Sequence, residues 1–277
     1  MKIALVTDSA CDIPYKMARN HQINVVPNIL VIEGKSVEDD EKFSRQKFYE
    51  ELPDMVTFPT TSTASAGRYQ ALYQNLLDSG FEQIVSIHVS HHLSGIFNAA
   101  STAAQLFAGQ VHVVDSLQVT LGLGFQVLEA AEAIADGASL DSVLALLNQI
   151  QGRVRLIAML DTLEYIRRSG RVSWARASLG TLLNLKPFIE VKDGLAISLG
   201  EVRTRRKGIA RLEKLMQTAR PLKRFALLHT NAEDDARQIL EAYAPQMATQ
   251  PLLVNVTTVI GAHVGPNGLG FVALYQD

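Results

Sequence analysis

Short apolar runs with the character of buried strands alternate with helical patterns along the first half of the chain. Each run is followed by a polar or glycine-bearing turn and then by a helix-like segment. This alternation is typical of a parallel sheet in an α/β domain, where ligands usually lie beyond the carboxyl ends of the strands. The candidate strands are Ile3–Thr7, Ile84–His88 and Val111–Val114, and the candidate helices are Ala66–Leu77, Gly95–Phe107, Leu121–Asp136 and Leu140–Gln151.

A second set of elements begins near Arg153 and includes a hairpin, because Asp193-Gly194 accepts the positive φ that a tight turn requires. A chain of 277 residues is long for one compact core. We therefore expect an N-terminal α/β domain with a mainly parallel sheet flanked by helices at residues 1–152, and a C-terminal α/β domain with a mixed sheet at residues 153–277. The expected strands of the second domain are Arg155–Met159, Lys186–Val191, Leu195–Leu199, Phe225–His229, Leu252–Val256 and Gly270–Tyr275, and its helices are Thr162–Arg168, Arg205–Ala219 and Ala232–Tyr243.

Charge and cysteine content narrow the function classes. The 26 Lys and Arg residues nearly balance the 28 Asp and Glu residues, which disfavours a general nucleic-acid binder because such a protein needs a basic excess. Cys11 is the single cysteine, so no internal disulfide can form, as is usual in a reducing compartment. No apolar run approaches the ~20 residues of a membrane span. We expect a soluble, cytoplasmic protein without stable membrane insertion.

Two hydroxyl-rich segments precede predicted helices and suggest an anion site. Thr60–Ser65 contains five hydroxyl residues, more than a helix cap needs, with Thr61 and Ser62 at its centre. Ser94 and Gly95 open the next helix, where a glycine permits close backbone approach and exposed amides attract negative charge. Each hydroxyl taken alone is ordinarily a cap, so the prediction rests on their number and position.

Two further segments contain groups suited to a carboxylate or phosphate. Arg171 follows Ser169-Gly170 in a turn and can point into a cleft, where a guanidinium pairs with oxyanions. His263 lies just before a turn made by three glycines between residues 265 and 270. His88, His91 and His92 lie close together but have no carboxylate or cysteine beside them in the sequence, so we predict no metal site.

The order of these segments resembles the DegV family across almost the whole chain. The resemblance is specific because the motifs follow one another in the family's order, although each is short. They are Thr7-Asp8-Ser9-Ala10-Cys11-Asp12-Ile13-Pro14, Thr61-Ser62-Thr63-Ala64-Ser65, Leu93-Ser94-Gly95-Ile96-Phe97-Asn98-Ala99-Ala100, Tyr165-Ile166-Arg167-Arg168-Ser169-Gly170-Arg171-Val172-Ser173 and His263-Val264-Gly265-Pro266.

The resemblance implies a two-domain protein with a long-chain fatty acid buried between the domains and no other cofactor. Some members of the family are the fatty-acid-binding subunit of a bacterial fatty acid kinase. By this resemblance Thr61 and Ser94 would hydrogen-bond the carboxylate, and His263 and Arg171 would lie beside it. Ser62 and Gly95 would shape the site as their neighbours.

The same resemblance predicts a non-catalytic chain that presents the carboxylate to a separate ATP-dependent kinase, because no nucleotide-binding motif is present. Arg203, Arg205 and Arg206 are candidates for docking that kinase, although such a run is often simply a solvated helix start. One alternative is a lipid carrier or sensor without a kinase. The other is a hydrolase with Ser94 as nucleophile, His263 as base and an acidic partner such as Asp115, since triads are defined by geometry.

Overall fold

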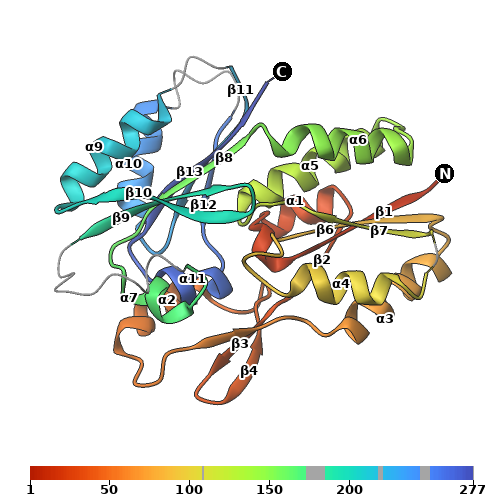
Figure 1. Ribbon diagram of the computed structural model, residues 1–277, viewed down its shortest axis with the longest axis horizontal. Helices are drawn as coiled ribbons and strands as arrows, with labels where there is room; N and C mark the ends of the chain where they lie inside the picture. Colours follow the sequence, from red (N-terminus) through yellow and green to blue (C-terminus); the bar gives the residue numbers. More distant parts are fainter. Residues whose placement is uncertain (108, 173–184, 218–220, 244–249, 277) are drawn as a thin grey trace.

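A four-stranded parallel sheet forms the first layer of the fold in the computed structural model, which describes residues 1–107, 109–172, 185–217, 221–243 and 250–276 (Figure 1). Its order is β2-β1-β6-β7, and every neighbouring pair is parallel. Strand β1 lies at the centre because its side chains are buried along its whole length. The strands are β1 (Ile3–Asp8), β2 (Ile23–Val26), β6 (Gln83–His88) and β7 (Val111–Asp115).

Helices cover both faces of this sheet, as strand–helix alternation predicts. Helices α3 (Ala66–Asp78) and α4 (Ile96–Ala104) contact β6 on one face, whereas α5 (Leu121–Ala135) packs on β1 from the other. Residues 121–131 of α5 are all buried because this helix also contacts the second sheet. Helix α6 (Leu140–Gln151) packs against α5. The short helices η1 (Ser9–Cys11) and α1 (Tyr15–Asn20) follow β1 and lead to β2.

The second sheet has six strands in the order β10-β9-β8-β13-β11-β12 and is mixed, as predicted. Only its pairing of β11 with β12 is parallel. Helices α9 (Arg205–Met216) and α10 (Glu233–Tyr243) cover the face that carries Ile157, Leu227 and Phe271. The strands are β8 (Val154–Met159), β9 (Lys186–Lys192), β10 (Leu195–Val202), β11 (Leu222–His229), β12 (Leu252–Asn255) and β13 (Leu269–Tyr275).

The opposite face of the mixed sheet joins the core of the parallel sheet. Leu156, Leu228 and Val272 belong to the same hydrophobic cluster as Val6 and Ile87 of the parallel sheet. Side chains that alternate along these strands therefore pack in two different cores. One core lies under α9 and α10, and the other is shared with α5. The confirmed architecture is an α/β fold with a parallel sheet flanked by helices and a second, mixed sheet.

A small third sheet was not predicted from the sequence. Its order is β4-β3-β5, and both of its pairings are antiparallel. Two helices lie near it in Figure 1, α2 (Arg45–Glu51) and α11 (Thr258–Val264), and η2 (Leu52–Asp54) follows α2. The strands are β3 (Ile29–Ile32), β4 (Lys35–Glu38) and β5 (Thr60–Ser62).

Three local expectations change in the structure. The hydroxyl-rich run is a strand at Thr60–Ser62, and it is Ser65 that caps α3 by accepting a hydrogen bond from the Arg68 amide. His263 belongs to helix α11, which the glycine-rich pattern around it did not predict. The predicted helix Arg205–Ala219 ends at Met216, and its last predicted positions, like Ser173 of the arginine-rich motif, lie outside the described residues.

Candidate functional site

A cavity of about 220 Å³ lies where the three sheets and α11 meet. This volume is far above the ~10–15 Å³ that admits one water molecule. The six residues singled out from the sequence all line it, although they come from segments up to 202 positions apart. They are Thr61, Ser62, Ser94, Gly95, Arg171 and His263.

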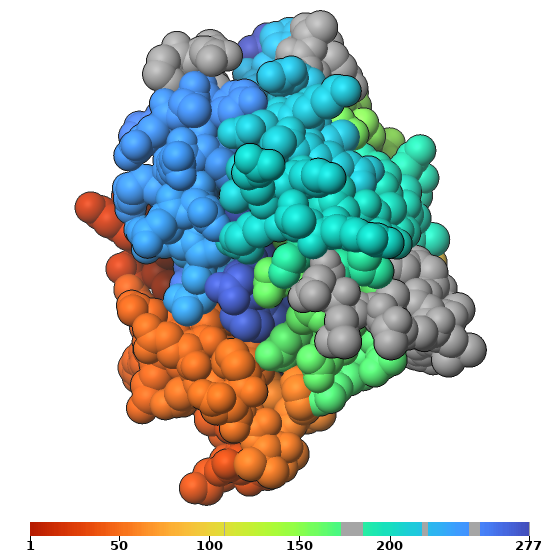
Figure 2. Space-filling model, turned by 90° about the vertical axis from the view of Figure 1, so that its left-hand side faces the viewer, coloured from red at the N-terminus to blue at the C-terminus, as the bar shows by residue number. Residues whose placement is uncertain are grey.

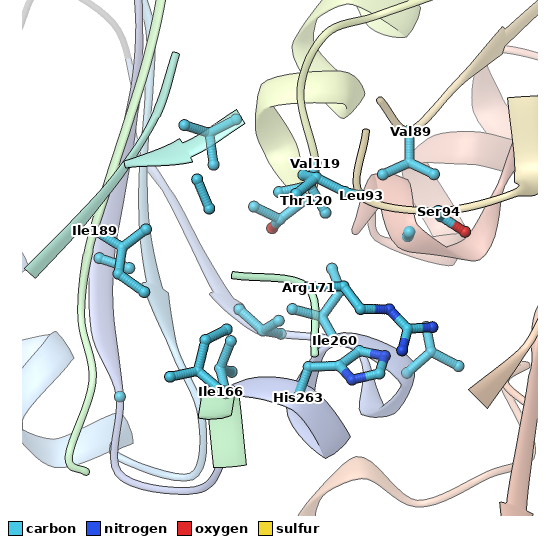
Figure 3. A pocket seen from close by; sticks show the side chains of 18 of the residues that line it. Val89, Leu93, Ser94, Val119, Thr120, Ile166, Arg171, Ile189, Ile260 and His263 are labelled. Carbon is cyan, nitrogen blue, oxygen red and sulfur yellow. The ribbon is translucent and has the colours of Figure 1, made fainter. Parts of the chain in front are cut away.

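The cavity has a polar end and an apolar remainder. Figure 3 shows Ser94, Arg171 and His263 on one side of the space, with Ile189 and Ile166 on the other. The mixed sheet, α11 and the loops after the parallel strands supply the apolar wall. Its members include Val89, Leu93, Ile96, Val119, Leu156, Ile166, Val172, Ile189, Val191, Leu228, Val256, Val259 and Ile260.

Thr61 and His263 form the hydrogen bond at the polar end. The Thr61 hydroxyl lies 2.8 Å from Nε2 of His263. Burial lowers the pKa of His263 from 6.5 to about 4, and the positive charge of Arg171 acts in the same direction. The imidazole is therefore neutral near pH 7, so it adds a hydrogen-bonding group to the cavity without adding a positive charge.

Ser94 and Gly95 connect β6 to α4. The Ser94 hydroxyl accepts a 3.4 Å hydrogen bond from the Ile96 amide, and Gly95 is the N-cap residue. Gly95 has a negative φ, and a Cβ built on it would meet only Thr63, at an ordinary 3.7 Å. The backbone thus does not require a glycine here, and what matters for a ligand is the start of α4, whose free amides favour an anion.

Arg171 and Ser62 are exposed at the rim of the cavity. Gly170 ends α7 (Glu164–Ser169) in the left-handed conformation, and the Arg171 guanidinium then donates to the Ser169 carbonyl at 2.7 Å. The Ser62 hydroxyl donates to the Thr63 carbonyl at 3.4 Å. Alternation along β5 directs Ser62 away from the face that carries Thr61, so Ser62 contributes less to the polar end than its neighbour.

A buried polar network that the sequence did not reveal fixes the start of α11. The Asp12 carboxylate accepts hydrogen bonds from Arg45 at 3.0 Å, from the Thr120 hydroxyl at 2.6 Å and from the Thr257 amide at 2.8 Å. Burial raises the pKa of Asp12 to about 6, and Arg45 opposes that rise. Asp39 accepts hydrogen bonds from the hydroxyls of Thr257 and Thr258. The network therefore anchors the helix that carries His263.

The triad required by the hydrolase alternative is not assembled. Asp115 accepts hydrogen bonds from His91 and from the Leu117 amide, and His263 is bonded to Thr61 instead. The Ser94 hydroxyl is hydrogen-bonded to the Ile96 backbone amide and not to an imidazole. Among the described residues, no group of three or more His, Cys, Asp and Glu side chains could hold a metal ion.

The basic run at the start of α9 divides into paired and unpaired residues. Arg205 forms an ion pair with Asp235 at 2.6 Å and donates to the Asn267 carbonyl at 2.7 Å. Arg203 and Arg206 are exposed and make no ion pair within the part of the chain that the structure describes. Figure 2 shows the surface of α9 (cyan) beside that of α10 (blue), with α11 (dark blue) below them.

No helix among the described residues is both long and apolar enough to cross a membrane.

Comparisons with known proteins agree with this architecture over the full length of the chain. Protein DegV of Bacillus subtilis (strain 168) is 33% identical over 277 residues, which cover 98% of this chain and 98% of that protein. The structure described as "Fatty Acid Binding of a DegV family Protein from Thermus thermophilus" has a TM-score of 0.90 at 32% identity and covers 100% of both chains. "Crystal Structure of DegV, a fatty acid binding protein from Bacillus subtilis" gives 0.87 at 32% identity, with 100% of both chains covered. The family model described as "Uncharacterised protein, DegV family" matches residues 2–276, and the chain belongs to this family.

Proposed function

We propose that this chain binds one long-chain fatty acid between residues 1–152 and 153–277, in the cytoplasm, with the carboxylate at Thr61, Ser94 and His263. The single observation that supports the proposal most directly is the cavity itself, which joins a polar end to a long apolar wall. Two similar proteins are described by their structures as fatty-acid-binding. The acid acts here as a ligand, and the chain does not transform it alone.

The acyl tail supplies most of the affinity. Each buried methylene contributes about 0.8 kcal/mol, so a chain of roughly fifteen methylenes contributes about 12 kcal/mol before entropy and desolvation losses. The wall is suited to such a tail because Ile189 of the mixed sheet lies across the cavity from Val89 and Leu93 (Figure 3), and Leu156 and Val191 of the same sheet also line the cavity.

The carboxylate head group determines where the ligand lies in the cavity. A carboxylate that leaves water needs donors to replace its hydration. The hydroxyls of Thr61 and Ser94 and the amides at the start of α4 are such donors, and Arg171 adds a positive charge at the rim. Neutral His263 with its proton on Nε2 donates to the Thr61 hydroxyl oxygen, which leaves the hydroxyl hydrogen of Thr61 free to donate to the carboxylate.

Ligand analysis and two substitutions test this proposal. Native mass spectrometry of the purified protein should detect a bound acid of about fourteen to eighteen carbons, the length implied by the tail energetics. In delipidated protein, Ser94→Ala and Thr61→Ala should each weaken binding by about 1–3 kcal/mol, because each leaves a buried carboxylate short of a donor. Thr102→Ala is the matched control, because Thr102 is an exposed hydroxyl on α4 that does not line the cavity. A delipidated protein without affinity for any long-chain acid would rule the function out.

We further propose that a separate ATP-dependent kinase docks on this protein and phosphorylates the bound carboxylate, with the exposed Arg203 and Arg206 assisting its approach. Charges at the rim of an interface mainly speed encounter and are screened by salt. Arg206→Glu should therefore slow acyl-phosphate formation most strongly at low ionic strength and leave fatty acid content unchanged. Arg205→Glu is the informative contrast, because Arg205 is bound to Asp235 and its loss should lower stability. A protein that forms no acyl phosphate with any kinase from its own cell would instead be a lipid carrier or sensor.

A further inference from the structure

One part of the cavity wall is a recess in the mixed sheet, over Ala158 and Gly270. These two residues pair with each other across β8 and β13. Gly270 also pairs with Leu228, and Ala158 pairs with Ile189, so a larger side chain stands on either side of the two small residues. All of these residues line the cavity. The sheet is therefore lower in the middle of this row than at its two sides.

The cavity reaches the backbone of the sheet at this recess. Met159 and Leu269 border the cavity, although their side chains belong to the core under α9 and α10. The Met159 sulfur lies against Gly208 of α9, on that other face. Because side chains alternate between the two faces of a strand, Met159 and Leu269 border the cavity through their backbone atoms. This is possible because Ala158 and Gly270 place only one methyl group over the strands.

The recess lies at the end of the cavity remote from the head-group site. Figure 3 shows Ile189 across the space from Ser94 and Arg171, and the strand register sets Ala158 directly beside Ile189. Behind the recess, the other face of the sheet carries Ile157, which is fully buried in the core under α9 and α10. Such cores are close-packed, so the sheet closes the cavity. A tail whose carboxylate is at the polar end therefore meets the sheet with its methyl end.

We propose that the recess receives the methyl end of the acyl chain, and that Ala158 sets the longest chain that the cavity accepts. The inference rests on the proposed fatty acid function and deepens it by assigning a residue that determines specificity. The Cβ of Ala158 is on the cavity face of β8, the face that also carries the cavity-lining Leu156 two residues earlier. A larger side chain at position 158 would thus occupy space that the last carbons of a long acid need.

Ala158 is a better position than Gly270 for testing the recess. A Cβ on Gly270 would lie 2.7 Å from the carbonyl oxygen of Ile157 and 3.2 Å from the Cα of Ala158, so any side chain there would displace the neighbouring strand. A longer side chain at Ala158 instead extends from an existing Cβ into the cavity. Substitutions of Ala158 therefore change the volume of the recess while leaving the strand pairing in place.

The experiment measures the affinity of delipidated protein for saturated acids of about twelve to twenty carbons, a range that brackets the proposed ligand. Ala158→Leu adds about three carbon atoms to the wall and should shift the best-binding length to shorter acids. Each methylene of a long acid that no longer fits should weaken binding about fourfold, while the shortest acids bind as before. Ala158→Gly enlarges the recess by one methyl group and should strengthen binding of the longest acids relative to the shortest.

Ala133→Leu is the matched control. Ala133 is a partly buried residue of α5 that does not line the cavity, so the same enlargement there should leave the dependence of affinity on chain length unchanged. Short and long acids are compared within each variant, so a general loss of stability does not alter the result.

The outcomes separate this inference from the proposed function. A folded Ala158→Leu protein that kept the parent's dependence on chain length, or that lost affinity equally for all lengths, would overturn the assignment and leave the function intact. If Ala158→Leu did not fold, Ala158→Gly would decide, and an unchanged ratio of long-acid to short-acid affinity would overturn the assignment. Absence of binding of every acid to the parent protein would overturn both.

Discussion

His263 makes the stability of the ligand-free protein depend on pH. Burial, aided by Arg171, lowers its pKa from 6.5 to about 4 in the folded chain. Between these two values the unfolded chain binds a proton that the folded chain does not, so stability falls as the pH falls from about 6.5 towards 4. Each pKa unit is worth about 1.4 kcal/mol, and the full effect is therefore about 3 kcal/mol.

Urea unfolding of delipidated protein at a series of pH values measures this effect. His263→Gln should flatten the stability profile between pH 6.5 and 4 by about 3 kcal/mol relative to the parent protein. Thr61→Val keeps the imidazole and removes its hydroxyl partner, and it should retain most of the slope because burial is the main cause of the lowered pKa. If His263→Gln and the parent protein had parallel profiles, the imidazole would not be the buried neutral group described here.

Two further substitutions test how the site is held in place. Arg45→Met should destabilise the fold by about 3–5 kcal/mol in urea unfolding, because it leaves Asp12 buried without its charged partner; a loss below about 1 kcal/mol would mean that the remaining hydrogen bonds of Asp12 suffice. Gly265→Ala should be more destabilising than Gly137→Ala in the same assay. Both glycines have positive φ, but a Cβ on Gly265 would lie 2.3 Å from Tyr165, whereas one on Gly137 meets nothing within 4 Å. Equal losses would show that backbone strain alone governs both positions.

Much of the fold could be predicted because its main strands are continuous apolar runs. Helix α6 was predicted to the residue at Leu140–Gln151, and the central strands β1 and β6 to within one residue at each end. The third sheet was missed because its strands are only three or four residues long and partly exposed, as in β4. Such segments have no clear alternation, and tertiary pairing decides their conformation.

Helix α11 shows why local pattern fails near the site. Gly261 disfavours a helix by propensity, yet a Cβ there would lie 2.3 Å from the Tyr49 hydroxyl, so close packing requires the glycine. The Tyr49 hydroxyl in turn donates to the Val256 carbonyl just before the helix. These contacts join positions more than two hundred residues apart, and no window of sequence contains them.

The candidate site was foreseen only in part, for the same reason. Residue pattern alone predicted an anion site near Thr61 and Ser94 and a candidate group at His263, whereas the resemblance supplied the specific role of each as a carboxylate neighbour. The anchoring pair of Asp12 and Arg45 had no signal in the sequence, since its function is to hold Thr257, far along the chain.

The position of the cavity links ligand binding to the integrity of the core. Val89, Ile96, Leu156, Val191 and Leu228 line the cavity and also belong to the cluster that joins the parallel sheet to the mixed sheet. Protein interiors are otherwise close-packed, so an empty space here leaves these side chains without contacts on one side. On the proposed function, an acyl tail would supply those contacts and, by binding only the folded chain, would stabilise the fold by mass action. The two sheets would then be held together partly by direct packing and partly through the ligand between them.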